Sequence, residues 1–159
     1  MRIQGQHHFE APREQVWAAL HDADVLASTL PGFQQLEQVS ENEFAGTLAI
    51  GIGPVQGRFE GRVTLSNLSP PESYSLHMSG RGTPGFVDGK GNIRLEERHD
   101  GTLLCYDIDL NIGGRIAGVG QRLLDMTSRM LTRQALKSLG RQIAARAPKQ
   151  GRTPSRNAG

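Results

Sequence analysis

Hydrophobic and polar residues alternate through most of the middle of the chain, between residues 33 and 112. The alternation is clearest in 55–65, where Val55, Phe59 and Val63 share one face and charged residues lie on the other. This period-two pattern predicts half-buried strands of an antiparallel sheet, and short segments rich in Gly, Pro, Asn and Asp predict the turns between them. The expected strands are 33–40, 43–52, 55–66, 73–81, 86–97 and 102–112.

Different patterns flank these six strands. Residues 2–10 alternate as a further strand, and Pro12, a residue tolerated in the first turn of a helix, begins a short helical segment. A second short helix is expected within 22–30, and apolar spacings of three and four predict a long helix over 114–145. This element order indicates an α+β helix-grip fold, in which a curved seven-stranded antiparallel sheet wraps around the long C-terminal helix.

The patterns also predict which side chains face the helix. In strand 102–112, Tyr106, Ile108 and Leu110 are expected inside, whereas Asp107 and Asp109 are expected in solvent. The inward positions expected on the long helix are Ile116, Val119, Leu123, Met126 and Met130.

Glycine is abundant, with 20 of 159 residues, well above a usual share of about 7%. Gly57, Gly61, Gly89 and Gly91 fall within predicted strands, and several share the inward face with large apolar residues. Missing side chains on the inner face allow three arrangements, which are a close approach of the helix, a sharp bend of the sheet, or a hollow. The residues alone leave these three open.

Charge is unevenly distributed behind a net charge of +2. Residues 1–125 hold ten bases and sixteen acids, or −6, and the remainder holds eight bases and no acid, or +8. Residues 148–159 contain no apolar side chain larger than alanine, which predicts a disordered basic tail after a domain spanning 1–147. No apolar run of about 20 residues and no secretory signal is present, so we expect a cytoplasmic protein.

Candidate catalytic and metal-binding residues are few. The five histidines (His7, His8, His21, His77 and His99) show no spacing that would make ligands converge, so we expect no metal site and no catalytic residue. Cys105, the single cysteine, has no histidine near it in sequence. Residues 80–85 have the letters G-x-G-x-x-G, but a strand rather than a helix follows them. The basic end contains no aromatic residue, so nucleic-acid binding is not expected.

Four glycine-containing blocks resemble the carbon monoxide dehydrogenase G-subunit family, a branch of the START-like (SRPBCC), polyketide-cyclase superfamily. The blocks are 30–32, 51–61, 85–89 and 113–122, and the resemblance covers about residues 1–145. Phe33 stands where the family often has cysteine.

The resemblance implies a hollow helix-grip domain that binds an apolar ligand, such as menaquinone, ubiquinone or another lipid. It also implies a noncatalytic role beside a molybdenum-containing carbon monoxide dehydrogenase or related hydroxylase, through membrane recruitment or electron transfer to quinone. The basic C-terminus suggests transient contact with an anionic membrane surface, at the inner membrane face, or with an acidic protein. The expected ligand-binding residues are Phe33, Phe59, Val63, Leu76, Met78, Phe86, Val87, Tyr106, Ile108, Leu110, Leu123, Met126 and Met130.

Two other functions stay open. A cyclase-type enzyme would act on an aromatic or polyketide substrate in the same cavity, and it would need polar groups converging there. The inward candidates for such groups are Tyr106 and His77. A structural assembly factor would instead fill the cavity with its own side chains. If the domain binds a ligand, we expect a cavity of the usual volume, about 300 to 1,000 Å³.

Truncation after Ala147 removes Lys149, Arg152 and Arg156, and we expect the thermal unfolding midpoint to stay unchanged. Association with anionic vesicles should weaken by roughly 1 kcal/mol per lost base at low salt, because each base is attracted to anionic headgroups. Co-sedimentation of both forms with neutral and anionic vesicles measures this difference. If neither form distinguishes the two lipids, an acidic protein partner explains the bases better.

Overall fold

The computed structural model describes residues 1–146 with their side chains, and the backbone of 147–158 within the last helix. The predicted basic tail at 148–159 lies outside the described side chains and stays a prediction. The strands are β1 (Arg2–Phe9), β2 (Phe33–Ser40), β3 (Glu43–Ile52), β4 (Val55–Ser69), β5 (Ser73–Gly82), β6 (Gly85–Arg98) and β7 (Gly101–Gly113). The helices are α1 (Arg13–Leu20), α2 (Ala23–Ala27), the 3-10 turn η1 (Arg115–Val119) and α3 (Gln121–Ala158).

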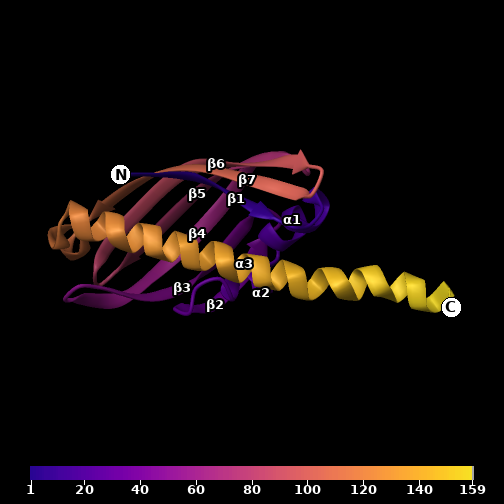
Figure 1. Cartoon of the computed structure of the whole chain (residues 1–159). Helices are drawn as coiled ribbons and strands as arrows, with labels where there is room; N and C mark the ends of the chain where they lie inside the picture. The colour runs from indigo at the N-terminus through magenta and orange to yellow at the C-terminus, as the bar shows by residue number, and fades with distance from the viewer. Residues whose placement is uncertain (159) are drawn as a thin grey trace.

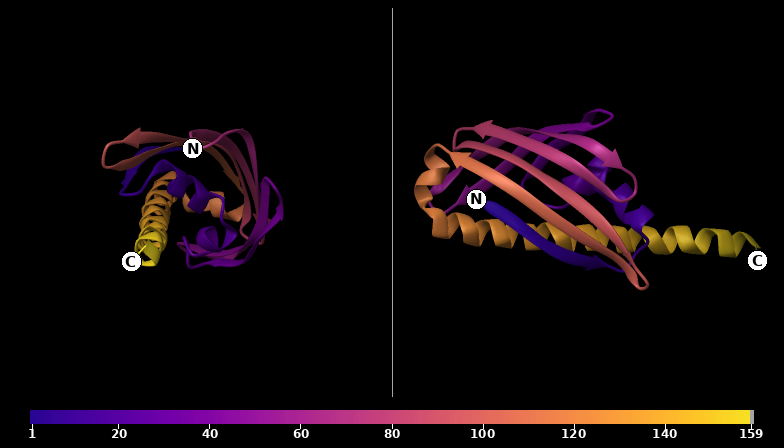
Figure 2. Two further views of the ribbon diagram at one scale, coloured as in Figure 1. Left: turned by 90° about the vertical axis from the view of Figure 1, so that its right-hand side faces the viewer. Right: turned by 90° about the horizontal axis from the view of Figure 1, so that it is seen from above.

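The seven strands form one antiparallel sheet in the order β1-β7-β6-β5-β4-β3-β2. Strands β2 to β7 are therefore a meander, and β1 closes the far edge by pairing with β7. The sheet curves around α3, as the end-on view in Figure 2 shows, and α3 runs along its concave side (Figure 1). The predicted helix-grip fold is confirmed.

Three irregularities in strand pairing accompany the curvature, one of them between Gln38 and Ser40 of β2. The β2–β3 register shifts between Gln34 and Glu37, and the β4–β5 register shifts between Ser66 and Ser69. Gln35 and Asn67 lie within these shifts and have left-handed backbones, with φ of 54° and 52°. Bulges of this kind bend a strand and increase its twist, so they contribute to the curvature of the sheet.

The hydrophobic core is divided into two clusters. The first lies beneath α1 and α2, where Val16 and Val25 pack with Tyr74, Leu95 and other sheet residues and with Leu139 and Ile143 of α3. The second lies at the opposite end of α3 and consists of Ile52, Val55, Phe59, Ile116 and Leu124. Each end of the concave face is thus packed separately.

The predicted continuous helix over 114–145 is wrong in its first part. Residues Arg115–Val119 form a 3-10 turn. Gly120 follows with a φ of 99°, a backbone angle that residues other than glycine rarely adopt. Because of this turn, the helix that follows directs a different set of residues towards the sheet than a continuous helix would. Ile116 is buried as predicted, but the buried apolar residues in the described part of α3 are Leu124, Leu139 and Ile143 rather than those that continue the phase of Ile116.

A buried hydrogen bond ties the start of α1 to the sheet. Thr102 is fully buried at the start of β7, and its hydroxyl donates to the carbonyl oxygen of Ala11 at 2.7 Å. The bond joins residues 91 positions apart and fixes the chain between β1 and α1.

Thr102→Val keeps the shape of this side chain but leaves the Ala11 carbonyl without its donor. We expect the free energy of unfolding to fall by about 1–3 kcal/mol, the usual effect of leaving a buried acceptor unsatisfied. Urea denaturation measures the change. Thr64→Val is the matched control, because the Thr64 hydroxyl bonds Glu43 in solvent; equal losses in both variants would contradict a special role for the buried bond.

Candidate ligand-binding site

An apolar cavity of about 270 Å³ lies between the two core clusters, on the inner side of the sheet. Phe44 of the first cluster lines it at one end, and Phe59, Ile116 and Leu124 of the second cluster line it at the other. The cavity is therefore the region that neither cluster fills. Its volume falls just below the predicted range.

Six predicted ligand-binding residues line this cavity: Phe33, Phe59, Val63, Met78, Val87 and Leu110. None of the predicted residues belongs to β3, which lines the cavity with alternate residues Phe44, Leu48, Ile50 and Ile52. The same alternation that identified 55–65 is present in this strand and would have found them. Sequence analysis also missed the α3 side of the cavity, which consists of Leu124, Thr127, Ser128 and Leu131.

Met126 and Met130 do not face the cavity, and this part of the prediction is wrong. Their side chains are 60% and 56% exposed on the outer face of α3. The physical reason is the turn at Gly120, which changes the phase of the helix relative to Ile116. Leu123 also lies outside the cavity lining, beside Gly53 in the β3–β4 turn.

Four other predicted residues are absent from the cavity lining. Phe86 is on the outer face of the sheet, where the Arg81 guanidinium lies 5.9 Å from its ring centre; it directly precedes the inward-facing Val87, and neighbours in a strand face opposite ways. Leu76 and Tyr106 pack against the first cluster. Ile108 lies over Gly91, whose ideal Cβ would come within 2.7 Å of the Ile108 side chain.

The strand glycines have mixed effects on the hollow. Gly46, Gly61 and Gly80 line the cavity, but only Gly80 has room for a side chain, since its nearest neighbour, Phe59, would lie 3.5 Å from an added Cβ. A Cβ at Gly46 would come within 2.9 Å of Leu36, and one at Gly61 within 3.1 Å of the Ser79 carbonyl oxygen. Gly89 contributes no space, because Leu110 and Met78 lie within 2.7 and 3.0 Å of where its Cβ would be. Of these four glycines, only Gly80 therefore leaves room beside the cavity, and neighbouring atoms occupy the space at the other three.

Polar groups are sparse in the cavity lining. They are Thr47, Ser79, Thr127, Ser128 and Arg62. The Arg62 side chain is 57% exposed and pairs with Glu43 at 3.0 Å, so its charge is directed to solvent. Among the described residues, no histidine, carboxylate, cysteine or tyrosine lines the cavity. The lining is thus suited to contact with an apolar group.

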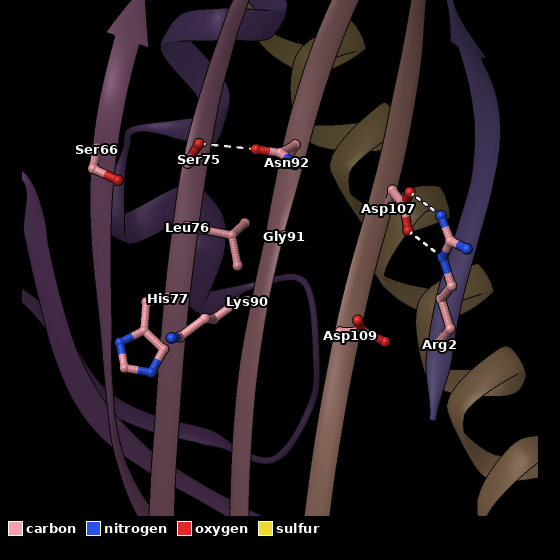
Figure 3. Close-up of a pocket in the computed structure, with 10 residues that line it drawn as sticks. All are labelled: Arg2, Ser66, Ser75, Leu76, His77, Lys90, Gly91, Asn92, Asp107 and Asp109. Carbon is pink, nitrogen blue, oxygen red and sulfur yellow. Dashed lines mark hydrogen bonds and ion pairs between the residues drawn. The ribbon is translucent and has the colours of Figure 1, made fainter.

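A polar hollow lies on the outer face of the sheet, and its lining includes Lys90, Asp107 and Asp109 (Figure 3). Asp107 accepts two hydrogen bonds from Arg2, at 2.8 and 2.5 Å, and these hold the pKa of its carboxyl below the ordinary value. Asp109 lies in the same outer hollow, so the prediction that both carboxylates face solvent agrees with the structure. His77 pairs with Asp88 at 2.9 Å on this face, which corrects its suggested inward position.

Three aromatic rings, those of Trp17, His21 and Tyr74, pack together outside the cavity lining. Trp17 stacks on His21 at 4.4 Å, and Tyr74 meets both rings edge-on. Burial lowers the pKa of His21 and raises that of Tyr74. Their contacts identify a packing role for these rings.

The part of the chain with described side chains contains no group of three or more His, Cys, Asp or Glu side chains arranged to hold a metal ion. No helix within it has the length and apolar character required to span a bilayer.

Comparison with solved structures identifies relatives across most of the chain. A conserved protein from Geobacillus kaustophilus is 31% identical, with a TM-score of 0.85 over 91% of this chain and 96% of that one. A Thermus thermophilus protein is 15% identical, with a TM-score of 0.70 over 91% of this chain and 98% of its own. The Zhui aromatase/cyclase from a Streptomyces species is 14% identical, with a TM-score of 0.66 over 91% and 95% of the two chains. At these lower identities the likeness shows the fold alone.

No curated protein matches the sequence. The family described as the carbon monoxide dehydrogenase G subunit (CoxG) matches residues 5–144, which include nearly all of the sheet, the cavity and most of the described part of α3. This match covers far more than half of the chain, and the chain belongs to the CoxG family.

Proposed function

We propose that this protein is a noncatalytic accessory protein that binds an isoprenoid quinone or similar lipid in the cavity between its two core clusters. The observation that carries the proposal is the cavity itself, which is lined mainly by apolar side chains in a chain of the CoxG family. The family name supports a molybdenum-containing carbon monoxide dehydrogenase or related hydroxylase as the partner.

The physical basis of binding is the transfer of apolar surface from water into this lining. Burial of apolar surface contributes roughly 25 cal/mol per Å², so burial of even part of an isoprenoid chain would contribute favourably to the binding free energy. A cavity of about 270 Å³ is small for a ligand site, and we therefore expect it to hold only part of a long ligand. The remainder would extend out of the cavity.

The polar lining favours binding over acid-base catalysis. A cyclase-type enzyme needs groups that donate and accept protons near the substrate, within hydrogen-bond reach. The uncharged polar lining residues are hydroxyl-bearing (Thr47, Ser79, Thr127 and Ser128), and the Arg62 charge is paired outside. The noncatalytic role therefore remains our proposal over the cyclase alternative.

The outer face of α3 supports transient contact with an anionic membrane. Arg122, Met126 and Met130 are exposed there, and Arg129 and Arg133 are exposed at the adjoining side of the helix, towards β1. Apolar side chains flanked by bases are typical of helices that lie in a membrane interface. The methionines that do not line the cavity would thus contact lipid, while the bases interact with its headgroups.

Filling the cavity should abolish ligand binding without destabilising the fold. We expect Val63→Phe to lower the affinity for decylubiquinone by tenfold or more, roughly the effect of losing 1.4 kcal/mol. Because the added ring enters a void, its effect on the thermal unfolding midpoint should be small. Native mass spectrometry after titration with decylubiquinone measures binding, and Met130→Phe on the exposed helix face is the matched control. Undiminished binding by Val63→Phe, or no binding by the unmodified protein, would exclude the cavity as a quinone site.

Replacing both exposed methionines tests the membrane contact. We expect Met126→Gln/Met130→Gln to reduce co-sedimentation with anionic vesicles severalfold, because each change removes apolar surface from the lipid contact. Val39→Gln is the control, since Val39 is 45% exposed on β2 and lies outside α3. Equal vesicle binding by all three proteins would show that α3 does not insert these side chains.

A further inference from the structure

A second concave region lies between the edge strand β1 and helix α3, with a volume of about 600 Å³. We call it the β1–α3 groove; the residues that matter here are Gln4, Tyr106, Ser128, Arg129, Arg133 and Lys137. The indigo strand and the orange helix that form its two sides are visible in Figure 2. Its lining differs sharply from that of the cavity, because bases and polar groups predominate.

Positive charge in the groove is poorly balanced. Arg129, Arg133 and Lys137 follow one another at intervals of four residues, so they lie on one side of α3. None of the three forms an ion pair among residues 1–146. Asp125, at one end of the groove, accepts a hydrogen bond from Gln121 at 2.9 Å, and Arg2 is already paired with Asp107. The groove therefore has an excess of cationic groups.

Strand β1 adds backbone donors to this charge. Met1 and Leu110 exchange two backbone hydrogen bonds, at 3.0 and 2.7 Å. Antiparallel pairing alternates, so the N–H groups of Arg2, Gln4 and Gln6 are directed away from β7, towards the free edge that borders the groove. Unpaired edge donors beside bases form a suitable environment for an anion.

Tyr106 supplies a further donor at the floor of the groove. Its ring lies across Gly5 of β1, where an ideal Cβ would come within 2.5 Å of the phenol oxygen. Only glycine allows this arrangement at position 5, and the hydroxyl thereby extends to the side of β1 that faces α3. The Tyr106 hydroxyl has no hydrogen-bond partner among the described side chains.

The groove and the cavity meet at Ser128, which lines both. Its hydroxyl lies 3.9 Å from the Met1 sulfur, and the Met1 side chain packs against the second core cluster. The side chains of Ser128 and Met1 therefore lie at this junction. A ligand that displaces them would extend from an apolar lining into a cationic one.

We infer that the β1–α3 groove binds the anionic end, a carboxylate or a phosphate, of an amphiphile whose apolar part occupies the cavity. The inference rests on the proposed function, since it uses the same cavity for the apolar part. It adds that an acidic amphiphile binds better than a neutral one of equal length, because the groove bases and donors interact with the charge directly.

The test compares cis-parinaric acid with its methyl ester, two probes with the same apolar chain whose fluorescence reports binding. At low salt we expect the acid to bind about tenfold more tightly than the ester, a factor that corresponds to about 1.4 kcal/mol. Arg129→Gln/Arg133→Gln should remove this preference by weakening the acid alone. Tyr106→Phe should reduce acid affinity severalfold and leave ester affinity unchanged, because it removes only the hydroxyl.

Arg115→Gln/Arg122→Gln is the matched control, since it removes the same charge from exposed positions outside the groove. Retention of the preference in this control supports the groove; an equal loss in both double variants would show a long-range charge effect and overturn the inference. Equal binding of acid and ester by the unmodified protein would also overturn it while leaving cavity binding intact. If neither probe binds while decylubiquinone does, the inference is overturned and the proposed function stands; if decylubiquinone also fails to bind, both fail.

Inorganic phosphate, added alone as a competitor, distinguishes the anionic end of an amphiphile from a free anion. We expect micromolar phosphate to displace neither probe, because it lacks the apolar chain. Displacement of the acid but not the ester would identify a free-anion site and overturn the spanning ligand.

Discussion

One helix covers the concave side of a seven-stranded sheet. Because the sheet is wider than the helix, this difference in width determines where the interior is packed and where it is hollow. Seven strands at about 4.8 Å spacing extend about 29 Å, whereas a helix with its side chains is about 10–12 Å wide. Curvature reduces the difference, and α1, α2 and η1 fill the two ends. The remaining space is the cavity on one side of α3 and the groove beside β1 on the other.

Most of the fold was predictable because each element has its own local pattern. Alternation identified all the strands, and Pro12 marked the first helix correctly. The residues of α3 that face inward were not predictable in this way. The apolar spacing predicts one continuous helix over 114–145, whereas the backbone changes direction at Gly120. A left-handed glycine between a 3-10 turn and an α-helix changes which residues face inward, although the apolar spacing on both sides looks continuous.

The candidate site was predicted only in part for a related reason. Val63, Met78 and Leu110 were found because strand alternation assigns them to the inner face. Their neighbours Ile108 and Tyr106 share that face but cover glycines on adjacent strands, a contact that depends on register. The groove was not predicted at all, because it joins residues at opposite ends of the chain through the pairing of β1 with β7.

That pairing also affects how the loops of the protein tolerate change in length. Met1 and Leu110 are 109 residues apart, so docking β1 closes nearly the whole domain into one loop. Closure entropy grows only with the logarithm of loop length, so ten residues inserted in a hairpin turn would add about 0.1 kcal/mol to this closure. The turns at the ends of the sheet are therefore free to differ in length between relatives, while β1 keeps its register with β7 and its position beside the groove.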